Sequence, residues 1–130
     1  MQKTDAKQIN IKLSVAYVEF GGNAGTNGQY FYAFNPSSVY ILSKDVSMNF
    51  ILSDNTDPRF KIVEFLSSDG IDQFKNPQHK ADNRVLSVTN KNASKQVIKI
   101  SIIVRDNEAP LTDGFFNCDP QVLNSPGTWD

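Results

Sequence analysis

The sequence predicts an all-β fold, an antiparallel β-sandwich of about seven to eight strands. Apolar residues recur with a period of two in most of the apolar segments, as they do in strands that bury one face. Clusters of Gly, Pro, Asn and Asp separate these segments, and no segment has the length and periodicity of an ordinary helix. A parallel sheet needs crossover helices, so the strands are expected to pair antiparallel.

In the first half of the chain, strands are expected at residues 9–18, 29–34, 39–42, 45–52 and 60–66. In the first of these, Ile9, Ile11 and Leu13 alternate with polar residues, which indicates one buried and one wet face. The glycine-rich stretch that follows has no Lys-Ser/Thr ending and opens no helix, so it does not match a phosphate-binding loop. It is expected to be a flexible hairpin connection.

In the second half, strands are expected at 84–89 and 96–105, with a short extended segment at 121–125, and the polar stretch 67–83 is expected to hold one helical turn at most. The clearest pattern is that of 96–105, which is expected to be a central strand because one face is apolar throughout and carries no proline: Ile98, Ile100, Ile102 and Val104. The length predicts a single domain, 1–130. Residues 1–7 are expected to form a flexible N-terminal lead and 125–130 a C-terminal tail.

Composition and charge exclude several classes of protein. The net charge is −1 and the basic residues are spread along the chain, so no nucleic-acid partner is expected. No apolar run approaches the roughly 18 residues of a membrane helix, so no membrane association is expected. The start of the chain lacks a secretory h-region and there is one cysteine, which favours a cytoplasmic protein.

Nucleophilic and zinc chemistry find little support. The only cysteine is Cys118 and the only histidine is His79, whereas a zinc site needs three or four such ligands. With too few ligands for zinc, no cofactor is expected. No protease signature surrounds either residue, so Cys118 is expected to be a small buried hydrophobic residue and not a nucleophile. The sequence leaves one kind of active site open, a pair of Asp or Glu carboxylates that folding brings together.

The C-terminal stretch contains an Asp-Pro step, Asp119-Pro120. Proline fixes its own φ, pushes Asp119 into the extended region and cannot donate to a ladder, which predicts that the step opens a final edge strand. The ending "IIVRD…GFFNCDPQVLNSP" resembles the bacterial DP-EP family, with Asp119-Pro120 as the first dipeptide and Ser125-Pro126 in place of the second. The resemblance covers about ten residues. It implies an immunoglobulin-like β-sandwich of unknown function and no catalytic residues.

Acidic loops offer a metal alternative. Calcium takes several oxygen ligands from clustered loop residues, and Asp106, Glu108 and Asp113 form the richest such cluster. None of the acidic loops has EF-hand spacing, and Asp and Asn are also ordinary turn residues. A solvated loop is therefore preferred over a calcium site.

Aromatic residues supply the surface candidates. Alternation places Tyr30, Tyr32 and Phe34 on one face of their strand and Phe31 on the other, and core packing explains most of the run. Tyr30 and Tyr32, with Trp129 near the C-terminus, are the candidates for a ligand or partner surface.

The favoured function is that of a non-catalytic module that contacts another protein or itself, as a homodimer through a sheet face or edge. The alternative is binding of a carbohydrate or small ligand through exposed aromatic residues. A calcium-binding sandwich and an enzyme are weaker alternatives.

Overall fold

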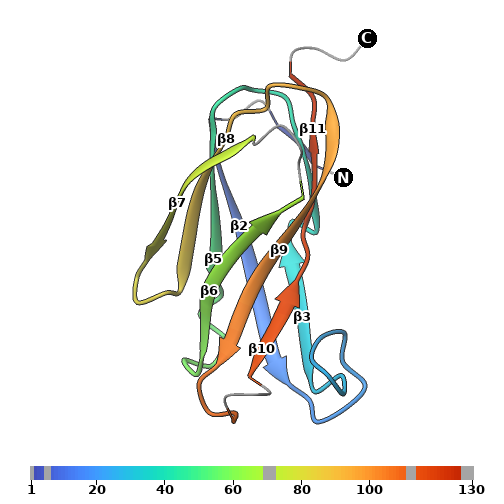
Figure 1. The fold of residues 1–130 in the computed structure, drawn as a ribbon, viewed down its shortest axis with the longest axis vertical. Coiled ribbons are helices and arrows are strands. Elements are labelled where there is room, and N and C mark those ends of the chain that lie inside the picture. Colours follow the sequence, from blue (N-terminus) through green and yellow to red (C-terminus); the bar gives the residue numbers. More distant parts are fainter. Residues whose placement is uncertain (1, 5–6, 69–72, 111–113, 127–130) are drawn as a thin grey trace.

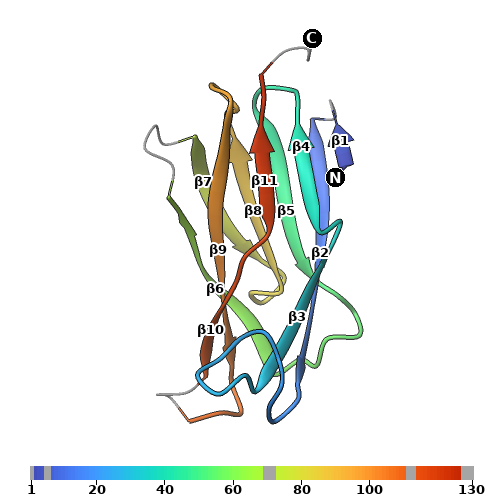
Figure 2. The same cartoon turned by 90° about the vertical axis from the view of Figure 1, so that its right-hand side faces the viewer.

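A computed structural model describes residues 2–4, 7–68, 73–110 and 114–126, and its strands form two sheets packed face to face (Figures 1 and 2). The described strands are β1 (Gln2–Thr4), β2 (Gln8–Tyr17), β3 (Tyr30–Asn35), β4 (Ser38–Ile41), β5 (Val46–Leu52), β6 (Phe60–Ser67), β7 (Phe74–Lys80), β8 (Val85–Asn90), β9 (Gln96–Asp106), β10 (Phe115–Cys118) and β11 (Gln121–Asn124). The predicted all-β sandwich is confirmed. No helix that could span a membrane occurs in the described part of the chain.

Both sheets are mixed, so the prediction of purely antiparallel pairing was wrong. The six-stranded sheet runs β1-β4-β11-β9-β10, with β6 on the other side of β9, and the five-stranded sheet runs β3-β2-β5-β8-β7. Strand β4 pairs parallel with both β1 and β11, and β2 pairs parallel with β5. These parallel partners are distant in sequence, so the chain between them crosses to the other sheet and no helical crossover is required.

The core lies between the sheets and uses the alternation seen in the sequence. From β9 it receives Ile98, Ile100, Ile102 and Val104, each no more than 2% exposed. From β5 it receives Val46, Met48, Phe50 and Leu52. Strand β9 has β10 and β11 along one side and β6 along the other, which confirms that 96–105 is a central strand.

Two strands escaped prediction because each lies at the edge of its sheet. Residues Gln2–Thr4, expected to be part of a flexible lead, form β1 beside β4. Strand β7, inside the stretch 67–83 expected to be a loop, pairs only with β8 and exposes every residue after Phe74. An edge strand is held mainly by its backbone, so its side chains need not alternate.

The C-terminal tail begins later than expected. Ser125 is buried and its backbone N–H donates to the carbonyl of Ile41, so the chain stays attached to the sheet beyond β11.

Candidate functional site

The Asp119-Pro120 step interrupts a ladder without changing its register. Cys118 lies opposite Ile102 and Gln121 lies opposite Lys99, so β10 and β11 are two parts of one antiparallel partner of β9. Pro120 has no N–H to donate. The backbone N–H of Asp119 donates instead to the hydroxyl of Tyr32, 3.2 Å away on the opposite sheet. At Asp119-Pro120 the chain therefore lacks a backbone hydrogen bond to β9 and forms a hydrogen bond to the opposite sheet.

The expectation that Asp119-Pro120 opens an edge strand was wrong. Strand β11 lies between β9 and β4, because β4 pairs parallel with it on the side away from β9. The Asp119 carboxylate accepts a bond from the hydroxyl of Ser101 at 3.1 Å, across the pair of strands. The sequence could not show that β4 returns to cover this side.

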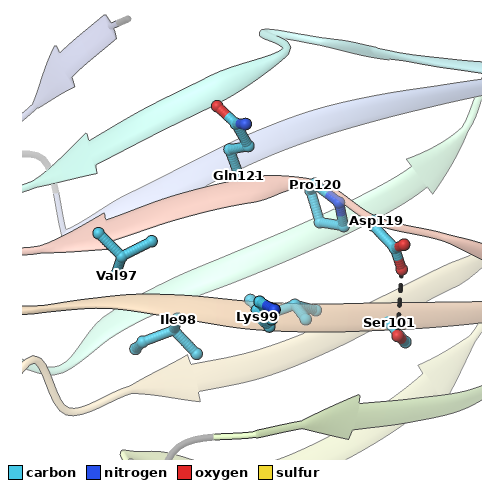
Figure 3. Close-up of a pocket in the computed structure, with 8 residues that line it drawn as sticks. Val97, Ile98, Lys99, Ser101, Asp119, Pro120 and Gln121 are labelled. Atoms are coloured by element: carbon cyan, nitrogen blue, oxygen red, sulfur yellow. Dashed lines mark hydrogen bonds between the residues drawn. The ribbon is translucent and has the colours of Figure 1, made fainter.

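A shallow groove lies along this step on the outer face of the six-stranded sheet (Figure 3). Its volume is about 390 Å³, and it is lined by Val97, Ile98, Lys99, Ile100, Ser101, Asp119, Pro120 and Gln121. Figure 3 shows the two walls, β9 on one side and the Asp119–Gln121 segment on the other, joined by the Ser101–Asp119 bond.

Apolar and charged side chains stand together in this groove. Val97 is 75% exposed, a large value for a β-branched residue. Lys99 and Asp119 are both exposed on the same face, and neither forms an ion pair among the described residues. Since Lys99 lies opposite Gln121 and Asp119 lies next to Pro120, the two charges are diagonal neighbours across the groove. The groove thus offers one cation, one anion and an apolar side chain.

The same outer face continues away from the groove with further exposed apolar groups. Leu66 on β6 lies opposite Ser101 and is 53% exposed. Phe115 on β10 is half exposed, and the guanidinium of Arg105 lies 5.0 Å from its ring centroid. The face is therefore amphipathic along the length of β9.

Of the aromatic candidates, Tyr30 is not on the surface. It is 1% exposed, stacks on Phe116 with ring centroids 4.2 Å apart, and donates its hydroxyl to Asp106 Oδ2 at 2.6 Å. Tyr32 is half-buried on the same face and accepts from the Asp119 N–H, and burial raises its pKa. Alternation grouped the two residues correctly, but the face they share is the one that packs on the second sheet. Trp129 lies outside the described residues.

The structure places the acidic candidates Asp106 and Glu108 in different environments, one buried and one exposed. The side chain of Asp106 has no exposed surface, and Arg59 donates to both of its oxygens, from Nε at 2.7 Å and Nη2 at 2.8 Å. Glu108 is exposed, with Oε1 3.8 Å from Arg59 Nη1, and its backbone N–H donates to Asp106 Oδ1 at 3.0 Å. Asp113 lies outside the described residues. Asp106 therefore serves an ion pair inside the protein, and it is neither the solvated loop residue that the sequence favoured nor an exposed calcium ligand.

The electrostatics of this cluster keep it charged. Burial would raise the pKa of Asp106, but bonds from Arg59, Tyr30 and the Glu108 N–H outweigh burial and hold that pKa below its usual range. The bond to Asp106 raises the pKa of Arg59. Burial, and then the bond to Asp106, raise the pKa of Tyr30 strongly. No cluster of three metal-ligating side chains occurs among the described residues.

Cys118 is a buried core residue, as expected. It has no exposed surface, and burial raises the pKa of its thiol, so it offers no thiolate. His79 is exposed on β7, in the other sheet. The only histidine and the only cysteine therefore cannot act as a base and nucleophile pair.

The groove residues Val97 and Lys99 were missed by the sequence reasoning, although a signal was present. Val97 and Ile103 interrupt the polar face of the β9 pattern, which otherwise carries Lys99 and Ser101. This departure from alternation marks the place where the outer face of β9 exposes apolar surface.

Comparison with models of known protein families finds no match, and comparison with curated proteins finds no significant relative.

Proposed function

We propose that this protein is a non-catalytic contact module that associates with a second copy of itself through the outer face of the six-stranded sheet. The observation that carries the proposal is the groove at Asp119-Pro120, with the exposed Val97 beside the unpaired charges of Lys99 and Asp119. The resemblance of the C-terminal stretch to the DP-EP family stays a prediction.

The arrangement of charges favours a second copy as the partner. A two-fold interface brings the same patch from both subunits together, so the patch must be complementary to itself. When two such grooves face each other, Lys99 of each copy can meet Asp119 of the other while the two Val97 side chains pack together. A patch with charges of one sign would repel its own copy.

Association through a sheet face is favoured over strand addition at the edges of the five-stranded sheet, because both of these edges carry features that hinder pairing with another strand. At β3, the side-chain amide of Asn23 bonds both the N–H and the carbonyl of Tyr32, at 2.8 and 2.9 Å. At β7, Asn76 has φ 56°, Pro77 follows it, and the ladder shifts register between Lys75 and Gln78. Such features prevent another chain from adding as a strand.

The test is a charge exchange between two variants of the full chain. Lys99→Glu and Asp119→Lys should each be monomeric in sedimentation equilibrium at concentrations where the wild type is dimeric, since each homodimer would pair like charges. An equimolar mixture of the two variants should form a heterodimer, because both cross-subunit pairs then join opposite charges, one as in the wild type and one with reversed sign.

Val97→Glu should abolish association without loss of fold, because Val97 is exposed in the monomer. Glu64→Gln, on the same face but outside the groove, is the matched control and should leave association unchanged. A wild-type protein that is monomeric at every accessible concentration, or a mixture of the charge variants that does not associate, would contradict the proposal.

A further inference from the structure

A second pocket lies between the β2–β3 loop, which Figures 1 and 2 show at the lower end of the molecule, and the residues Ala109 and Pro110 that follow β9. It has a volume of about 240 Å³, and Tyr17, Glu19, Asn27 and Gln29 line one side while Ala109 and Pro110 line the other. We propose that this pocket binds one ring of a neutral sugar. The inference does not depend on the contact face proposed above.

Tyr17 supplies an aromatic wall. Its side chain is 50% exposed, so part of the ring is open to solvent. The ring is held from behind by Tyr30, edge to face at 5.8 Å, and by Arg59, whose Cζ lies 5.6 Å from the ring centroid. A held, half-exposed tyrosine presents a flat apolar surface next to a polar hydroxyl, which suits the C–H face of a pyranose ring.

Three polar side chains surround this wall. The Glu19 carboxylate has no hydrogen bond or ion pair to the described residues, and its backbone has φ 67°, a left-handed conformation that is rare for glutamate. Gln29 Oε1 accepts from the Asn27 N–H at 2.9 Å, which orients this side chain and leaves its NH₂ group as a donor. Adjacent sugar hydroxyls both donate and accept, so they match a carboxylate beside an amide donor.

The loop that carries these groups is built in advance of binding, contrary to the expectation of a flexible connection. Val18 N–H donates to Gln29 O, and Gly22 N–H donates to Gly28 O, both at 2.8 Å. A Cβ on Gly22 would lie 1.9 Å from the Tyr30 carbonyl oxygen, so only glycine allows the loop to pack this closely on β3. A pre-formed loop lowers the entropic cost of ordering a ligand.

The charge of the pocket selects against anions. Among the described residues that line it, Glu19 is the only charged one, and the nearby Arg59 is already paired with Asp106. A phosphate or carboxylate ligand would meet an uncompensated carboxylate. A neutral polyol avoids that repulsion and can use the carboxylate as a strong acceptor.

The experiment is an NMR titration of the full chain, labelled with ¹⁵N, with glucose, galactose, mannose and N-acetylglucosamine up to 50 mM each. At least one sugar is expected to shift the side-chain amide signals of Asn27 and Gln29 and the backbone signal of Glu19 in a saturable way. Glu19→Gln should weaken that binding by about tenfold, the change that loss of one charge-assisted hydrogen bond produces. Tyr17→Ala should abolish the shifts.

The matched control is Phe31→Ala. Phe31 is 49% exposed, close to the value for Tyr17, but it lies on the outer face of the five-stranded sheet away from the pocket, so its loss should leave sugar binding unchanged. Asn27→Ala, at an exposed loop position, provides a further variant in case Tyr17→Ala fails to fold, and it should also weaken binding. If none of the four sugars shifts the pocket signals, if Glu19→Gln and Asn27→Ala both bind as the wild type does, or if Phe31→Ala weakens binding as much as they do, the proposal is overturned.

Discussion

The hydroxyl of Tyr30 and the carboxylate of Asp106 lie 76 residues apart in the chain and meet across the two sheets at 2.6 Å. Tyr30 belongs to the edge strand β3 of one sheet, and Asp106 ends β9 of the other. Arg59 completes the cluster by donating to both oxygens of Asp106. One end of the sandwich is therefore held by a charged, hydrogen-bonded cluster in addition to apolar packing.

Loss of the Asp106 carboxylate should destabilise the protein. Asp106→Ala is expected to lower the free energy of unfolding by about 1.5–3 kcal/mol, because Tyr30 and Arg59 each lose a partner and Tyr30 stays buried. Urea denaturation followed by fluorescence measures the change. Glu108→Ala is the matched control, since this exposed carboxylate lies 3.8 Å from the same arginine and should change stability by less than about 0.5 kcal/mol. Equal effects of the two variants would argue against the cluster.

The protein should lose stability at alkaline pH. The pKa values of Tyr30 and Cys118 are raised in the folded state, mainly by burial, from ordinary values of 10.0 and 9.0. Above those values the unfolded chain releases protons that the folded chain retains, so the free energy of unfolding falls as the pH rises through them. Denaturation series at pH 7, 9 and 10.5 measure this slope. Tyr30→Phe should make the slope between pH 9 and 10.5 shallower, and an unchanged slope would show that Tyr30 ionises freely in the folded state.

At acid pH the sign is reversed for Asp106. Its pKa is lowered on folding, so its contribution is present above the ordinary value of 3.8 and is lost as the pH falls through the lowered folded value. Acid titration of wild type and Asp106→Ala, followed by circular dichroism, should show the smaller loss of stability in the variant.

A buried pair of amides joins the sheets at the opposite end. Asn90 on β8 and Asn124 on β11 exchange two hydrogen bonds, each 2.8 Å long, and neither side chain is exposed. Each Asn→Ala change should cost about 1–3 kcal/mol, because it leaves the other amide buried without its partner. A double-mutant cycle should give a coupling energy of about 0.5–3 kcal/mol.

The chain contains a matched control for that cycle. Asn10 and Asn49 also form an amide pair, at 2.9 Å, but on the exposed outer face of the five-stranded sheet. Because water can replace the lost partner there, the coupling between Asn10→Ala and Asn49→Ala should stay below about 0.5 kcal/mol. Coupling of the same size in both pairs would mean that burial does not decide the strength of these bonds.

Cys118 should react with a thiol reagent only when the protein unfolds. Its side chain is fully buried next to Asp119, and its pKa is raised, so native protein holds almost no accessible thiolate. The rate of reaction with Ellman's reagent at pH 8 should rise by orders of magnitude between buffer and 8 M urea. Rapid labelling in buffer would place Cys118 at the surface.

The sequence alone determined most of the strands and the groups of residues that share a face on them. Ile98, Ile100, Ile102 and Val104 form a continuous core face on β9, as their alternation indicates, because the side-chain period of a strand follows from local backbone geometry. The burial expected of Cys118 followed from residue chemistry in the same way. Period-two patterns were readable wherever one face is buried and the other is wet.

Only the tertiary structure decided which face, which neighbour and which partner each group has. Alternation cannot say whether the face with Tyr30 and Tyr32 points to the core or to solvent, since both faces of β3 carry aromatic residues. It also cannot place β11 between β9 and β4, or bring Asp106 to Arg59, because strand order and ion pairs depend on contacts between residues far apart in the chain. Strand β1 has only three residues, too few for an alternating pattern, and β7 exposes every residue after Phe74, so its side chains show no alternation. Both are held by backbone bonds to a neighbouring strand, which only the tertiary structure reveals.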